Sequence, residues 1–234
     1  MKALKPSFTI IELIIVIIII GILAYTINFN FFDNNLKLAA DQIENHIRYT
    51  ESLAFKDDKY RPFPVNDNNQ TEKNRSKFWF MQWWQIRFSK KRNGDIYYVV
   101  FSDSPDYDRN PIPSETAKDP LTHQHLYGDY SHLTATNKLN LTQTYGIKEM
   151  RFDNISLTSG HPKRILFDNF GNVFLNEGSL IASDNNYTLY NRTTSGRPLL
   201  NHILHIDLCK DLNCNICIRL NLTPAGEVYQ TNCN

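Results

Sequence analysis

The sequence carries almost no net charge, few glycines and prolines, and no cysteine before position 209. A formal net charge of +1 gives no overall electrostatic attraction for a polyanion such as nucleic acid. With 9 glycines and 10 prolines in 234 residues, no segment is typical of a long flexible linker, and no internal repeat is evident. The motifs G-x-S-x-G, G-x-x-x-x-G-K-[ST] and H-E-x-x-H are absent, so we do not expect an enzyme.

What the sequence does contain is one long apolar run near its start. Between positions 8 and 29, the residues that are not apolar are Thr9, Glu12, Gly21, Thr26 and Asn28. About 20 helical residues cross the ~30 Å hydrocarbon core of a bilayer, so this run predicts a membrane-spanning helix. Lys2 and Lys5 precede it, which favours a cytoplasmic N-terminus and an extracytoplasmic C-terminal domain.

Glu12 stands out because a carboxylate inside hydrocarbon costs several kcal/mol unless it is paired or protonated. If the chain were cut between Ser7 and Phe8, the new amine of Phe8 would lie one helical turn from Glu12, near the positive end of the helix dipole. The amine could equally belong to an adjacent chain. The alternative is that Glu12, near a helix end, reaches back to the membrane interface.

The sequence FTIIEL at positions 8–13, followed by GILA at 21–24, resembles the class III signal of type IV pilins and type II secretion pseudopilins. The resemblance implies a leader peptide over residues 1–7, cleavage between Ser7 and Phe8, and N-methylation of Phe8 by a prepilin peptidase. It also implies that Glu12 pairs with the Phe8 amine of a neighbouring subunit during assembly. Ser7 replaces the usual glycine, and Phe29 replaces a proline that many pilins have.

The same resemblance implies a place for the protein: the bacterial inner membrane as a single-pass protein with a periplasmic C-terminal domain, and then an assembled pilus or pseudopilus. Its expected partners are other pilin or pseudopilin subunits, the prepilin peptidase and the inner-membrane assembly platform. The expected function is that of a minor pilin-like structural subunit of a type II secretion or type IV pilus machine. A competence-type minor pilin that binds DNA is the alternative, and a membrane-anchored metalloprotein is a third.

Beyond the apolar run, the pattern becomes periodic. Apolar residues recur at helical spacing at Leu36, Ala39, Ala40, Ile43, Ile47 and Ala54, with charged residues between them. We therefore expect an α+β fold in which one long N-terminal helix spans the membrane over residues 8–32 and continues as an amphipathic helix over 33–58. This helix should pack on an antiparallel β-sheet domain over residues 59–234, as in the pilin fold.

Several segments of this domain are typical of strands. We expect a hairpin from 78–89 and 96–101, a loop over 102–136, strands within 147–157, 164–167 and 172–174, and a closing hairpin from 216–222 and 227–231. Segments 47–54, 165–173 and 217–228 are similar to parts of the GspH/FimT group of minor pseudopilins. Its DNA-binding members carry arginines after the last glycine, whereas this chain has Gly226-Glu227-Val228-Tyr229.

The cysteines, at positions 209, 214, 217 and 233, allow two bridges with three connectivities. Exported domains meet oxidising conditions, in which disulfides persist. Folding the closing hairpin about Ala225 sets Cys217 opposite Cys233, which predicts the pairs Cys217–Cys233 and Cys209–Cys214. The spacing also resembles a plant-type iron–sulfur run, so a metal site is the alternative.

Two weaker patterns concern ligands. Asp106, Asp108 and Asn110 match the start of a calcium loop, but Pro111 replaces the expected glycine. The alternative is a solvated acidic turn. Apart from calcium, we expect no cofactor. Basic and aromatic residues also alternate in one stretch, a pattern that can bind single-stranded nucleic acid. The near-zero net charge favours the alternative, an aromatic core strand with a solvated basic turn. These residues are Lys77, Trp79, Trp83, Arg87 and Arg92.

Overall fold

The computed structural model describes residues 9–60, 63, 65–66, 68–77, 79–103, 110–129, 136–177 and 199–233. Its helices are α1 (Ile10–Lys56), α2 (Gln70–Lys77) and α3 (Leu141–Tyr145), with the 3-10 turns η1 (Trp79–Gln82), η2 (Pro113–Glu115) and η3 (Asn137–Leu139). Its strands are β1 (Trp84–Lys90), β2 (Ile96–Ser102), β3 (Glu149–Phe152), β4 (Ile155–Ser156), β5 (Lys163–Phe167), β6 (Val173–Glu177), β7 (Leu204–Cys209), β8 (Cys217–Leu222) and β9 (Val228–Asn232).

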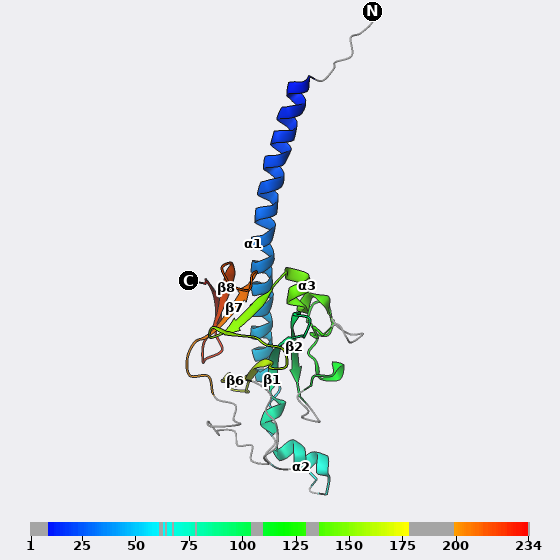
Figure 1. Cartoon of the computed structure of the whole chain (residues 1–234). Coiled ribbons are helices and arrows are strands. Elements are labelled where there is room, and N and C mark those ends of the chain that lie inside the picture. Colours follow the sequence, from blue (N-terminus) through cyan, green and yellow to red (C-terminus); the bar gives the residue numbers. More distant parts are fainter. Residues whose placement is uncertain are drawn as a thin grey trace, which may run out of the picture.

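The second half of α1 packs on the β-strands, while the first half projects away from them (Figure 1). The helix contacts strands of both sheets: β1 and β5 of one sheet, and β7, β8 and β9 of the other. It ends at Lys56, where the N–H of Asp57 donates to the carbonyl of Leu53 at 3.0 Å. The end falls where the sequence predicts it, shortly before Pro62 and Pro64.

The periodic face of α1 is the centre of the core. Ile43 and Ile47 are fully buried, and the other members of the predicted face are at most 3% exposed. These side chains belong to one continuous apolar cluster with residues of both sheets, such as Ile86 of β1 and Leu220 of β8. The predicted amphipathic helix is therefore confirmed in this segment, because burying one apolar stripe is what holds a surface helix to its domain.

The strands form two antiparallel sheets rather than the single sheet domain that we expected. One sheet has the order β2-β1-β5-β6 and the other has the order β4-β3-β7-β8-β9. The predicted fold class, an N-terminal membrane-spanning and amphipathic helix on one antiparallel sheet in the pilin fold, is wrong on this point. Each sheet contains a pair of strands that lie far apart in the chain, β1 with β5 in one sheet and β3 with β7 in the other. Local sequence patterns do not reveal such long-range pairs.

The membrane-spanning part of that prediction is also contradicted. In the part of the chain that the structure describes, no helix combines the length and the apolarity that crossing a membrane requires. The predicted span over residues 8–32 and the predicted single-pass inner-membrane location are therefore wrong.

The two predicted hairpins are present with small shifts. β1 pairs with β2 around a turn at Asn93 and Gly94, where Gly94 has φ +94°, and β8 pairs with β9 in the predicted register, with Leu222 opposite Val228. The first strand begins at Trp84 rather than at residue 78, because residues 79–82 form the 3-10 turn η1. Alternating aromatic residues before Trp84 were the reason for the longer prediction.

Glycine turns from the two sheets meet the last turns of α1. Gly171, in the β5–β6 turn, has φ +82°, and a Cβ there would lie 2.9 Å from Cζ of Phe55. Gly226, in the β8–β9 turn, has φ +86°, and a Cβ there would collide with the carboxylate of Glu51. Both positions therefore favour glycine because of their left-handed backbone conformation.

The buried face of α1 predicts a stability difference along one helix. Replacing Ile47→Ala leaves a cavity in the shared core, and we expect it to lower the free energy of unfolding by about 2–5 kcal/mol. Leu38→Ala, at a side chain that is 54% exposed, is the matched control and should cost less than about 1 kcal/mol. Urea unfolding of the two variants measures this, and equal losses would contradict the assigned face.

Candidate functional site

The first half of α1 projects away from the strands (Figure 1), and it carries a large apolar surface that nothing in the described chain covers. Its large apolar side chains between positions 10 and 23 are 45–80% exposed. They are Ile10, Ile11, Leu13, Ile14, Ile15, Val16, Ile17, Ile18, Ile19, Ile20, Ile22 and Leu23. Soluble monomers rarely expose contiguous apolar patches of this kind, so the surface is the clearest candidate for an interaction site.

Glu12, the one charge on this surface, belongs to the cap that starts the helix. Thr9 is the N-cap residue, and its side-chain oxygen accepts from the N–H of Glu12 at 3.4 Å. In return, Oε2 of Glu12 accepts from the backbone N–H of Thr9 at 2.8 Å and from its hydroxyl at 2.9 Å. These two hydrogen bonds, the backbone one first, lower the pKa of the Glu12 carboxyl, so it is a carboxylate at neutral pH.

This arrangement is a capping box, in which a threonine and a glutamate three residues later satisfy each other's backbone N–H groups. The sequence expectation gave Glu12 a role toward a Phe8 amine or, as the alternative, toward the membrane interface. It missed this local role, although T-x-x-E at positions 9–12 is the signature of a capping box. Ser7 and Phe8, the predicted cleavage and methylation positions, lie outside the described residues.

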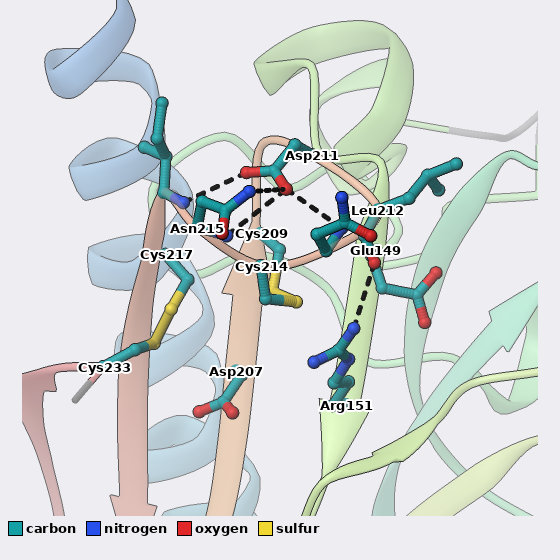
Figure 2. Close-up of a disulfide and its surroundings, with 12 residues drawn as sticks. Glu149, Arg151, Asp207, Cys209, Asp211, Leu212, Cys214, Asn215, Cys217 and Cys233 are labelled. Atoms are coloured by element: carbon teal, nitrogen blue, oxygen red, sulfur yellow. Dashed lines mark hydrogen bonds between the residues drawn. A yellow bond between two sulfur atoms is a disulfide. The ribbon is translucent and has the colours of Figure 1, made fainter.

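The four cysteines form the two predicted disulfides (Figure 2). Cys217 of β8 is bonded to Cys233 just after β9, with 5.8 Å between their Cα atoms, and Cys209 of β7 is bonded to Cys214 with 4.9 Å. The first pair continues the β8–β9 register that sets Ile218 opposite Asn232, as the hairpin argument requires. Because every cysteine sulfur is in a disulfide, the iron–sulfur alternative is wrong for these residues.

The loop between Cys209 and Cys217 is organised by Asp211 (Figure 2). Its Oδ1 accepts from the N–H of Asn213 at 2.9 Å and of Asn215 at 3.2 Å, and Oδ2 accepts from the N–H of Ile216 at 3.0 Å. These backbone hydrogen bonds, the one from Ile216 first, lower the pKa of Asp211. Its oxygens are thereby committed to the loop, which holds Cys214 in place for the disulfide with Cys209.

The weak calcium prediction gains no support. Asp106 and Asp108 lie outside the described residues, and Asn110 is an exposed residue in a bend. Across residues 9–233, within the ranges that the structure describes, no three His, Cys, Asp or Glu side chains come together to hold a metal ion.

The candidate nucleic-acid residues lie on different elements of the described chain. Trp79 and Trp83 lie in and beside η1, where they contact each other, while Lys77 ends α2. Arg87 is half-buried on β1, and burial lowers the pKa of its guanidinium. Arg92 is exposed at the β1–β2 turn. The alternation in sequence is therefore broken in space by the change from the 3-10 turn to the strand.

A polar cluster at the edge of the buried face of α1 was not foreseen from the sequence. Nε2 of Gln42 donates to the hydroxyl oxygen of Tyr98 at 2.6 Å, and Nδ1 of His46 lies 2.6 Å from the same oxygen. The hydroxyl of Tyr145 donates to Oε1 of Gln42 at 2.6 Å. Since Gln42 donates to Tyr98, the Tyr98 hydroxyl proton is left for Nδ1 of a neutral His46.

Burial explains the protonation of this cluster. It lowers the pKa of His46 to about 4, against the opposing charge of Asp119, and it raises the pKa of the fully buried Tyr98. Both groups are therefore neutral at pH 7, and the cluster closes one side of a groove of about 580 Å³ between α1 and the turn at residues 119–124. The signal available in the sequence was the spacing of Gln42 and His46, four apart beside the apolar face.

Comparison with known proteins adds no relative: no protein-family model, curated protein or solved structure matches this chain.

The disulfides should differ in their contribution to stability because they close loops of different length. Their sequence separations are 16 residues for Cys217–Cys233 and 5 for Cys209–Cys214. The loop-entropy relation gives about 3 and about 2 kcal/mol respectively. We expect the double variant Cys217→Ala/Cys233→Ala to unfold at lower urea concentration than Cys209→Ala/Cys214→Ala, and the reverse order would contradict the entropic account.

His46 predicts a pH dependence of stability. Its native pKa of about 4 lies below the unfolded value of about 6.5, so the unfolded chain binds the proton more readily. The contribution is complete above pH 6.5 and is lost as pH falls from 6.5 to 4, by up to about 3 kcal/mol. We expect His46→Gln, which keeps an acceptor for Tyr98, to lose less stability between pH 7.5 and 4.5 than the unmodified protein does in urea unfolding. An identical pH dependence would show that His46 is not the group responsible.

Proposed function

We propose that this chain is a minor pilin-like structural subunit, a pseudopilin, of a type II secretion or type IV pilus machine. In this proposal, a prepilin peptidase cleaves the chain after Ser7 and methylates Phe8. The subunit then joins other pilin-like subunits through the exposed half of α1. The observation that carries the proposal is the uncovered apolar surface over residues 10–23, which contains a single carboxylate, that of Glu12.

The size of this surface supports a bundle of helices. Fully burying one Ile or Leu side chain contributes about 1.5–3 kcal/mol, so several such side chains buried against like helices outweigh an association cost of about 4–15 kcal/mol. The surface is apolar on all sides of the helix rather than along one stripe. A helix of this kind is suited to being surrounded by partners, not to packing on one neighbour.

The position of Glu12 supports a specific register within that bundle. Both contacts from Thr9 use Oε2, and among the described residues no donor contacts the other oxygen, Oε1. A carboxylate with a free oxygen, buried among apolar helices, would need a cation from a neighbouring chain. The methylated amine of Phe8 on the next subunit is the cation that this proposal assigns.

The two disulfides support the other half of the proposal, a domain that works outside the reducing cytosol. Disulfides persist in oxidising compartments, and both bridges join residues of the C-terminal strands and the loops beside them, outside the exposed half of α1. The domain is therefore stabilised by covalent links in the region that does not take part in helix assembly.

Two substitutions of Glu12 separate its charge from its capping role. Glu12→Gln keeps the capping box, because glutamine also accepts from the N-cap N–H, but removes the charge, whereas Glu12→Ala removes both. We expect the amount of each variant that co-purifies with other pilin-like subunits from the native host to fall at least about tenfold. Removing one partner of a buried ion pair leaves the other charge unpaired, which costs several kcal/mol. Glu227→Gln, at an exposed turn, is the control and should assemble normally.

Mass spectrometry of the N-terminus from the native host completes the test. We expect a mature chain that begins with methylated Phe8. Normal assembly of Glu12→Gln together with loss in Glu12→Ala would limit Glu12 to helix capping, and an intact leader on the assembled protein would refute the proposal.

A further inference from the structure

A second candidate site lies at the opposite end of α1 from the exposed apolar surface. It is a cleft of about 460 Å³ between the chain just after α1, the turn η1 and the β5–β6 turn. This volume is within the range of sites that hold small molecules, about 300–1,000 Å³. Its walls include five aromatic residues, Tyr60, Trp79, Trp83, Phe170 and Phe174.

The aromatic rings meet at steep angles and so form adjoining walls. The rings of Tyr60 and Trp79 are 4.9 Å apart with 76° between their planes, and those of Trp79 and Trp83 are 5.7 Å apart at 77°. Trp83 in turn packs against Phe174 at 4.7 Å. At the rim, Tyr60 is 59% and Phe170 is 79% exposed, so the aromatic lining is open to solvent on one side.

The charges around the cleft are all of one sign. Asp58 and Asp168 line it, and none of the described lining residues is Lys, Arg or His. Lys59 lies between two lining residues in sequence, but its ammonium pairs with Asp57 at 2.5 Å and sits 5.7 Å above the ring of Trp84. The nearest basic side chain in sequence is therefore held by groups outside the cleft.

The buried carboxylate of the cleft supplies charge rather than free hydrogen-bonding positions. Asp168 is 6% exposed, and its Oδ1 accepts from the N–H groups of Phe170 at 2.9 Å and Asn172 at 2.8 Å. Its Oδ2 accepts from Nδ2 of Asn172 at 2.8 Å. A sugar needs side chains that are ready to form hydrogen bonds with its hydroxyls, whereas Asp168 and Asn172 are committed to each other and to the turn.

Aromatic faces and two carboxylates, with no Lys, Arg or His among the described lining residues, together select a cation. Because the oxygens of Asp168 already accept from the turn, the buried carboxylate favours a cation without N–H donors. We propose that this cleft binds a quaternary ammonium group, such as a trimethylammonium, carried either by a free small molecule or by a phosphocholine headgroup. The rings contact the methyl groups, and Asp58 and Asp168 stabilise the positive charge. The site does not depend on filament assembly.

The full chain titrated with choline tests the proposal through the fluorescence of its tryptophans, two of which line the cleft. The matched control ligand is 3,3-dimethylbutan-1-ol, which has the shape of choline without the charge. We expect choline to bind at least about tenfold more tightly than the alcohol, since a desolvated cation–aromatic contact contributes about this factor. Phosphocholine, titrated in parallel, distinguishes the two sources: tighter binding than choline points to the headgroup, and weaker binding to a free cation.

Variants of exposed lining residues locate the binding without endangering the fold. We expect Phe170→Ala and Asp58→Asn each to weaken choline binding about three- to tenfold, because each removes one aromatic or one charged contact. Leu212→Ala, at a side chain that is 66% exposed on the loop between β7 and β8, is the control and should bind as the unmodified chain does. Equal binding of choline and the alcohol, binding unchanged in both variants, or no binding of either ammonium ligand would each overturn the proposal.

Discussion

The structure depends on one contact, the packing of the second half of α1 against both sheets. Ile43 and Ile47 are fully buried in a core that also contains Ile86 from one sheet and Leu220 from the other. Both sheets pack on the same apolar face of α1. If this helix were displaced, the apolar residues of both sheets would be exposed to water together. The polar edge of the contact is also closed, since Gln42 and His46 of α1 share the hydroxyl of Tyr98 from β2.

The same helix carries two surfaces with opposite requirements. Residues 36–54 follow a helical stripe and are covered by their own chain, whereas residues 10–23 are apolar on every side and are covered by nothing described. A single stripe needs one partner layer, and an apolar cylinder needs several. The chain supplies the first partner itself, and the proposed assembly supplies the second.

Local patterns predicted the features that local physics decides. The stripe from Leu36 to Ala54 and the pairing of Cys217 with Cys233 follow from helical and strand periods, and the structure contains both. The division into two sheets could not be predicted in this way, because β1 pairs with β5 and β3 with β7 across long intervening segments. Trp79 was assigned to a strand because aromatic residues alternate there, although η1 uses them in a turn. The length of the apolar run predicted a membrane span that the described residues do not provide.

The positions of the two candidate sites along α1 make them compatible with each other. A helix of 47 residues is about 70 Å long at 1.5 Å per residue. The apolar surface occupies its N-terminal part, and the aromatic cleft begins at Asp58, two residues beyond its C-terminal end. Subunits that bundle through residues 10–23 would therefore leave the cleft beside the opposite end of α1 from the bundle. The cleft would then stay open to a small cation in an assembled filament as well as in the free chain.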